Sequence, residues 1–178
     1  MKPLRQSILA LIGLALAGCS QTPPLERIVP SESASALEHW REKVQDDYTA
    51  AQWQDFDLAL QEIQFKIIAE PDAKGADPVE AKVRAAIAGH TVREVLRLGF
   101  ESRLARLDAE GAKLEEFILM NAKAKSGSSQ SAADFKNQIY TQLSLLSRVD
   151  DEMERTGQKL DLLLQRPHVV HKPRQPLP

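Results

Sequence analysis

Residues 89–123 read GHTVREVLRLGFESRLARLDAEGAKLEEFILMNAK, and this stretch decides the fold. Gly89 suits the left-handed conformation that commonly ends a helix. Thr91 and Glu94 then match a capping box, in which two side chains satisfy free amides at a helix start. Helical spacing follows, with a stripe formed by Val92, Val95, Leu96, Gly99, Leu107, Gly111, Leu114 and Ile118. The pattern predicts a tight corner and then a long helix over residues 92–123.

A second long helix is predicted directly downstream. The run SGSSQ at residues 126–130 is typical of a flexible turn. Helical spacing resumes over residues 132–165, with inward positions at Phe135, Ile139, Leu143, Leu146, Val149, Met153, Leu160 and Leu163 or Leu164. Because a short turn joins two helices of similar length, we expect them to pack side by side as an antiparallel hairpin.

Two glycines lie inside the first long helix. Gly99 and Gly111 each cost about 1 kcal/mol relative to alanine in a helix interior. Either they mark bends or they let another helix approach closely, and we favour close approach. The charged residues around them are expected to form a solvated outer face: Arg97, Glu101, Arg103, Arg106, Asp108 and Glu110.

Shorter helices are predicted upstream. One covers residues 33–48, with an inward face of Leu37, Trp40, Val44 and Tyr48. A capping box at Thr49 and Gln52 begins the next, whose stripe is Trp53, Phe56, Leu60, Ile63 and Ile67. That helix ends before Pro71, and a short helix is expected over residues 78–88. The sequence therefore predicts an all-α helical domain over residues 33–165, in which shorter helices pack as a bundle on a coiled-coil-like hairpin.

The N-terminal residues have the layout of a secretory signal. Lys2 and Arg5 give a positive start, residues 8–17 form an apolar run, and small residues precede Cys19. The run is shorter than the ~20 residues that a membrane-spanning helix needs. Cys19 is the only cysteine in the chain. An ordinary signal peptide, or an N-terminal helix with a chance cysteine, is the alternative.

The four residues Leu16-Ala17-Gly18-Cys19 resemble the lipobox of bacterial lipoproteins. The resemblance implies a signal peptide over residues 1–18, cleavage between Gly18 and Cys19, and acyl chains such as palmitate on Cys19 that anchor the protein to a membrane. Ser20, rather than aspartate, follows the cysteine, which by the same resemblance favours the outer membrane of a Gram-negative cell, with the domain in the periplasm or at the surface. The corner at residues 89–94 is also loosely similar to an element of small helical lipoproteins of unknown function.

Proline-rich segments flank the helical domain. Residues 19–32, which include Pro23, Pro24 and Pro30, are expected to form a flexible lipidated tether. The alternative is an ordered extension that packs on the domain. Residues 166–178 contain four prolines and three basic residues but no acid. This composition predicts a disordered, extended, basic tail.

No pattern in the sequence is typical of an enzyme: we find no nucleophile elbow, phosphate-binding loop or dinucleotide fingerprint. His168 and His171 lie in the predicted tail without an obvious third ligand, so we expect no metal site and no cofactor. Acid pairs such as Asp46-Asp47 point apart on helices, which favours a solvated face over acid–base catalysis. A net charge of −2 gives no support to nucleic-acid binding.

These observations favour a non-enzymatic, lipid-anchored envelope protein that presents a helical surface to a protein partner, as an accessory or assembly factor. The alternative is an inhibitor or immunity-type lipoprotein that blocks an envelope-active enzyme. The aromatic residues of the first helices are expected in the core, with an exposed interface hot spot as the alternative. The candidate partner contacts are Trp40, Tyr48, Trp53, Arg166, Lys172 and Arg174.

Overall fold

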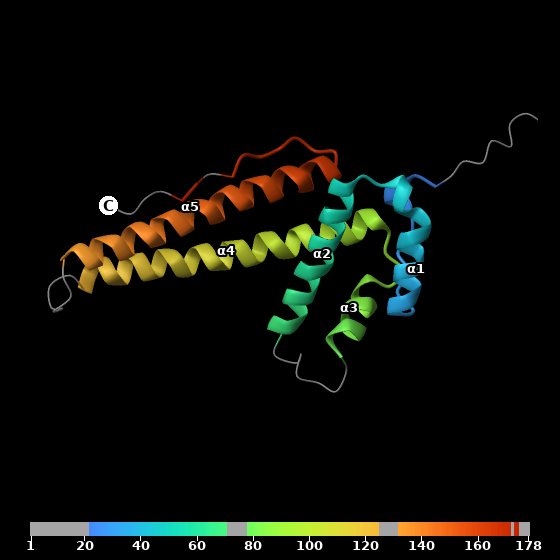
Figure 1. The fold of residues 1–178 in the computed structure, drawn as a ribbon. Coiled ribbons are helices and arrows are strands. Elements are labelled where there is room, and N and C mark those ends of the chain that lie inside the picture. The colour runs from blue at the N-terminus through green and yellow to red at the C-terminus, as the bar shows by residue number, and fades with distance from the viewer. Residues whose placement is uncertain (1–21, 71–77, 125–131, 172, 175–178) are drawn as a thin grey trace, which may run out of the picture.

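The computed structural model describes residues 22–70, 78–124, 132–171 and 173–174. Over these ranges it contains no β-strand, which confirms the all-α prediction. The elements are η1 (Pro24–Glu26), α1 (Ala34–Val44), η2 (Gln45–Asp47), α2 (Ala50–Ala69), α3 (Val79–Ile87), α4 (Val92–Ala124) and α5 (Ala132–Leu163). Figure 1 shows α1–α3 gathered around the beginning of α4, while the rest of α4 runs on beside α5.

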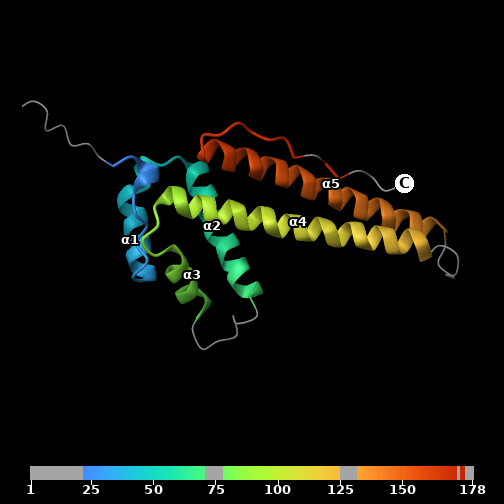
Figure 2. The ribbon, with the colours of Figure 1, turned by 180° about the vertical axis from the view of Figure 1, so that it is seen from behind.

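The two long helices form the predicted antiparallel hairpin, and they stay side by side when the molecule is seen from behind (Figure 2). Its interior holds a small apolar cluster of Leu107, Val149 and Met153, flanked by Leu104 and Leu114. With 33 residues, α4 is about 50 Å long. The turn expected at residues 126–130 lies outside the described residues.

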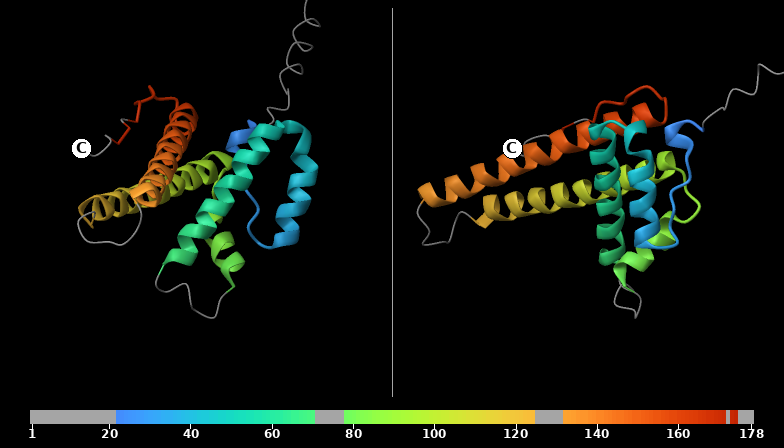
Figure 3. Two further views of the ribbon diagram at one scale, coloured as in Figure 1. Left: turned by 60° about the vertical axis from the view of Figure 1, so that its left-hand side comes forward. Right: turned by 45° about the vertical axis from the view of Figure 1, so that its right-hand side comes forward.

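Helix α2 crosses α4, as Figure 3 shows in two further views, and Ala59 of α2 lies against Gly99 of α4 at the crossing. A Cβ atom at Gly99 would lie 2.3 Å from the Cα atom of Ala59, so only glycine permits this approach. Ala59 is fully buried, and Val95 and Phe100 close the core around the crossing. Close helix approach, the favoured interpretation of this glycine, is therefore confirmed.

The corner before α4 has the predicted geometry. Gly89 has φ of 75°, in the left-handed region. The Thr91 amide donates to the Glu94 carboxylate at 2.8 Å, and the Glu94 amide donates to the Thr91 hydroxyl at 3.3 Å. The second predicted capping box, at Thr49 and Gln52, is also present at the start of α2. These local signals set where the helices begin.

Residues 22–32, within the segment expected to form a tether, pack on the domain, which is the alternative of an ordered extension. Val29 is 1% exposed, its amide donates to the carbonyl oxygen of His90, and the Val92 amide donates to the carbonyl oxygen of Arg27, both at 2.9 Å. The physical reason is the corner itself, because its free backbone groups pair with this segment as an isolated bridge between Ile28 and Thr91. Residues 19–21 lie outside the described residues.

The tail differs from expectation in a similar way. It is extended, as predicted, but it reverses at the end of α5 and runs back along that helix (Figure 1). We call the described part of this segment, residues 166–171, 173 and 174, the strap. It is held because its basic groups meet carboxylates on α4 and α5. The prediction of a disordered basic tail considered the tail's own charges but not the acids facing it.

Candidate functional site

The aromatic candidates form one cluster where α1, α2 and η1 meet. The ring centroids of Tyr48 and Trp53 are 4.9 Å apart, and those of Trp40 and Trp53 are 5.9 Å apart. The Tyr48 hydroxyl donates to the carbonyl oxygen of Pro24, and burial raises the pKa of Tyr48. Phe56, 1% exposed, extends the cluster into the core. The arrangement fits the core interpretation, and partner contact at Trp40, Tyr48 and Trp53 stays a prediction.

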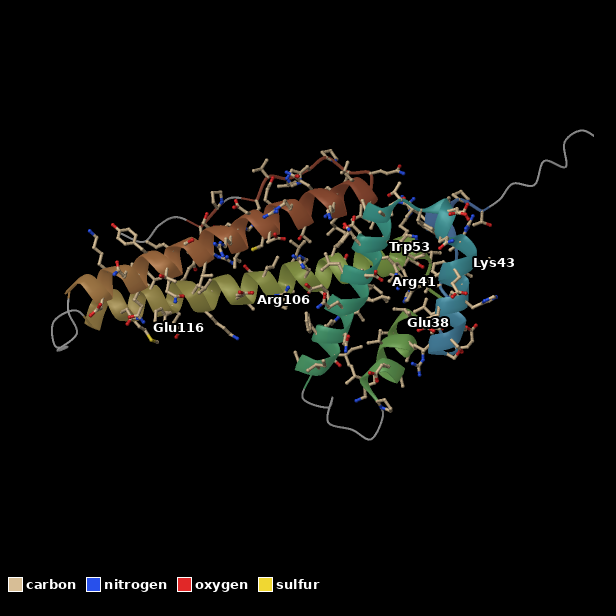
Figure 4. The ribbon with its side chains drawn as sticks, viewed as in Figure 1. Glu38, Arg41, Lys43, Trp53, Arg106 and Glu116 are labelled. Atoms are coloured by element: carbon tan, nitrogen blue, oxygen red, sulfur yellow. The ribbon has the colours of Figure 1, made fainter. Side chains whose placement is uncertain are left out.

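One edge of this cluster reaches the surface through Trp53. The Arg41 guanidinium lies 5.0 Å from the centre of the Trp53 ring and pairs with Asp57 at 2.8 Å. Figure 4 shows Arg41 and Trp53 near each other, between α1 and α2. Arg41 and Asp57 cover the exposed edge of the Trp53 ring, so this region is a packed contact between α1 and α2.

A buried ion cluster joins α2 to both long helices. The Glu62 side chain is 2% exposed and accepts hydrogen bonds from Arg103 at 3.0 Å and from Arg106 at 2.7 and 2.8 Å. Arg103 also donates to Glu152 of α5 at 2.8 Å. Arg103 and Arg106 were expected on a solvated outer face, but both guanidinium groups turn toward the buried Glu62 carboxylate. The missed signal is spacing: Glu62 lies three positions after the buried Ala59, on the same side of α2.

The charge state of Glu62 follows from its partners. Burial alone would raise the pKa of the Glu62 carboxyl, but the hydrogen bond and charge of Arg106, with those of Arg103, lower its pKa overall. The same interaction raises the pKa of Arg106. A carboxylate held ionised by two guanidinium groups is a structural fastening rather than an acid or base for catalysis.

A hollow of about 560 Å³ lies beside this cluster, between α2 and α4. Its walls include Phe65, Lys66, Ala105, Arg106 and Ala109. Phe65 is 42% exposed there, with the Arg106 guanidinium 5.8 Å from its ring centre. Of the charged groups on its wall, Arg106 is committed to Glu62.

The basic candidates of the tail are engaged within the molecule. Arg166 pairs with Asp161, which is itself 5% exposed. The Arg174 guanidinium is seated between α4 and α5, where it lies 2.7 Å from Asp108, 3.2 Å from Asp150 and 3.4 Å from Glu115. Lys172 lies outside the described residues, as do Gly18 and Cys19.

Gly111 makes room for the Arg174 side chain, because a Cβ there would lie 1.8 Å from its Nη1 atom. The expectation that close approach at this glycine would come from another helix is therefore corrected. The approaching group is a guanidinium from the strap. Spacing along the helix could identify the gap but not its occupant.

Chemistry-bearing clusters are scarce in the part of the chain that the structure describes. Over those residues no group of three or more histidine, cysteine or carboxylate side chains is arranged to hold a metal ion. Over the same residues no helix combines the length and the apolar character that crossing a bilayer requires.

A family-model comparison finds no match for this chain, and neither the curated proteins nor the solved structures contain a match. The functional argument therefore rests on the molecule itself.

Proposed function

We propose that this protein is a lipid-anchored, non-enzymatic interaction protein of the cell envelope, which presents the far end of the α4–α5 hairpin to a protein partner. The observation that carries the proposal is the set of large apolar side chains exposed there. They are Phe117, Leu119, Met120, Tyr140 and Leu145, each between 37% and 60% exposed. Phe117 and Met120 lie one turn apart on the same side of α4. A contiguous exposed apolar patch commonly marks a surface that binds another protein.

The N-terminal segment supports a role that depends on position. If Cys19 carries the lipid, two residues, Ser20 and Gln21, separate it from Thr22, so the chain can place the anchor at most about 10 Å from the packed body. From there Arg27 pairs with Asp47 at 2.5 Å, and Glu26 pairs with Arg93 at 2.7 Å. Such a body is held close to the bilayer, and its hairpin extends away from the point where the chain enters (Figure 1).

The anchor is tested by metabolic labelling with a palmitate analogue followed by membrane fractionation. We expect labelled protein in the membrane fraction, and neither label nor membrane retention in the Cys19→Ser variant. Unlabelled wild-type protein would contradict the anchor.

The interaction surface is tested by photo-crosslinking in cells. A benzoylphenylalanine replaces Met120 or Tyr140, which are 60% and 58% exposed. The matched control replaces Leu162, which is 78% exposed on α5 but lies near the other end of the hairpin. We expect one discrete crosslinked product from the first two positions and none from the third.

The outcomes separate the two function classes. A crosslinked non-enzymatic envelope protein supports the adaptor proposal. A crosslinked hydrolase, whose activity falls when this protein is added, supports the inhibitor alternative in its place. Equal products from all three positions, or none from any, would contradict an interface at the hairpin end.

A further inference from the structure

His168 of the strap is held by both nitrogen atoms of its ring. Nδ1 lies 2.8 Å from the Asp161 carboxylate and Nε2 lies 2.7 Å from the Glu154 carboxylate. A carboxylate only accepts hydrogen bonds, so both nitrogens have to donate for both bonds to exist. Only the imidazolium form has two N–H donors. The docked geometry therefore fits the charged ring and does not fit the neutral one.

The surroundings of the ring reinforce this requirement. From α5, the charged groups that face it are Glu154 and Asp161, with Gln158 donating to Glu154 at 3.0 Å. From the strap, Arg166 pairs with Asp161. The hydrogen bonds and charges of the two carboxylates raise the pKa of His168 and outweigh its modest loss of solvation.

The strap backbone depends on the same two carboxylates. The Val169 amide donates to Asp161 at 3.3 Å, and the His171 amide donates to Glu154 at 2.8 Å. By contrast, Val169 and Val170 are 82% and 71% exposed and bury little apolar surface. The first half of the strap is thus attached by polar contacts centred on one titratable ring.

The second half of the strap has a different attachment. A guanidinium group does not titrate in the range in which histidine does. The backbone amide of Arg174 also donates to Asp150, at 3.2 Å. The chain reverses at Gln165, between the end of α5 and the first half of the strap. The backbone is strained there, because Gln165 has φ of 53°, in the region that favours glycine. The strap therefore has a pH-sensitive attachment next to its hinge and a pH-insensitive one farther along.

We propose that the strap is a proton-controlled cover: it lies on α5 while His168 is protonated, and its first half lifts when His168 loses the proton. Lifting exposes the Glu154 and Asp161 carboxylates, so the surface that becomes accessible is acidic. Neutral His168 leaves one carboxylate facing a ring nitrogen without a hydrogen, so deprotonation removes one hydrogen bond and both ion pairs of the ring. This device goes beyond the proposed function and requires neither the lipid anchor nor a partner.

The test is the backbone mobility of the strap in the purified full chain, measured by ¹⁵N heteronuclear NOE at about pH 5.5 and about pH 8.5, on either side of the ordinary histidine pKa of about 6.5. We expect the Val169 and His171 amides to be rigid at the lower pH and mobile at the higher. Because one proton is released, the ratio of docked to lifted strap falls by up to about tenfold per pH unit between the unfolded and folded pKa values of His168.

Three variants separate titration of His168 from other causes. His168→Ala leaves the first half mobile at both pH values. His171→Ala keeps the transition, since the Nε2 atom of that ring has no hydrogen-bond partner among the described residues. In Arg174→Ala we expect the backbone amide of residue 174 to be mobile at both pH values, while the Val169 amide still changes from rigid to mobile as pH rises. A strap equally rigid at both pH values in the wild type, or a transition lost in His171→Ala and kept in His168→Ala, would overturn the proposal.

Discussion

Helix α4 is approached closely at two glycines, and the two approaches differ in kind. At Gly99 the neighbour is the backbone of α2, within a core where Val95 and Ala59 are fully buried. At Gly111 the neighbour is a guanidinium, and the groups around it are the carboxylates of Asp108, Glu115 and Asp150. The difference teaches that two glycines twelve positions apart in one helix permit different contacts. Gly99 permits an apolar helix crossing, and Gly111 permits a seat held by ion pairs.

Substitution at the crossing has the largest expected effect. In Gly99→Ala the new Cβ meets the Cα and carbonyl oxygen of Ala59, so backbone has to move. We expect overpacking to lower the free energy of unfolding by about 3 kcal/mol. The higher helix propensity of alanine raises it by about 1 kcal/mol. The net loss of about 2 kcal/mol is measured by urea unfolding followed by circular dichroism. Unchanged stability would show that α2 does not sit on α4 in this way.

The ion cluster beside the crossing ranks second. Glu62→Gln removes the charge shared by Arg103 and Arg106. Breaking a fully buried pair costs about 3–5 kcal/mol, but Arg106 is 39% exposed, so we expect about 1.5 kcal/mol after solvent screening.

The pH dependence of this cluster has a definite sign. The pKa of Glu62 is lowered in the folded state. Its contribution is therefore present above the unfolded pKa of about 4.5 and disappears as pH falls through the folded pKa. We expect the stability difference between wild type and Glu62→Gln to shrink in acid, and a difference that grows there would contradict the assignment.

The matched change at the second glycine sharpens the comparison. In Gly111→Ala the new Cβ meets only the end of a flexible side chain. We expect global stability to rise by up to about 1 kcal/mol through helix propensity, while Arg174 leaves its seat. Urea unfolding measures the first effect, and the chemical shift of the Arg174 amide measures the second. A loss of stability equal to that of Gly99→Ala would erase the distinction between the two sites.

The smallest effect is expected at the strap hinge. Gln165 adopts a left-handed conformation that glycine adopts without strain. We expect Gln165→Gly to favour the docked strap by about 0.5 kcal/mol, the relief of strain being partly offset by the greater freedom of glycine in the lifted state. Slower amide exchange at Val169 than in the wild type is the expected result, and faster exchange would show that the hinge carries no strain.

Local signals predicted much of the fold. The capping boxes at Thr49 and Thr91, and the helix end at Gly89, need only neighbouring residues, so short patterns specify them. Packing of Val29 under the corner depends on backbone groups that only the folded corner offers. Pairing of Glu62 with two arginines more than forty residues away depends likewise on the crossing angle of α2 and α4. Charge patterns along the chain show where charges lie, but not which of them the fold brings together.

The strap shows the same limit at the candidate site. Arg166 and Arg174 were candidate partner contacts in a tail that carries no acid of its own. Arg166 pairs with Asp161 of α5, and Arg174 pairs with Asp150 of α5 and with Asp108 and Glu115 of α4. The three α5 acids that face the strap, Asp150, Glu154 and Asp161, share one helical face. That spacing was visible in the sequence, but the reversal at Gln165 that brings the tail to it was not.

The most direct test of the contrast between the two sites is residue-resolved amide hydrogen exchange at low salt and at about 1 M salt, where the Debye length falls to about 3 Å. The account predicts that exchange at Val169, His171 and Arg174 becomes faster in salt, while exchange at Val95 and Phe100 stays unchanged. Loss of protection at both sites together, or at neither, would contradict the claim that one approach to α4 is apolar and permanent and the other is ionic and releasable.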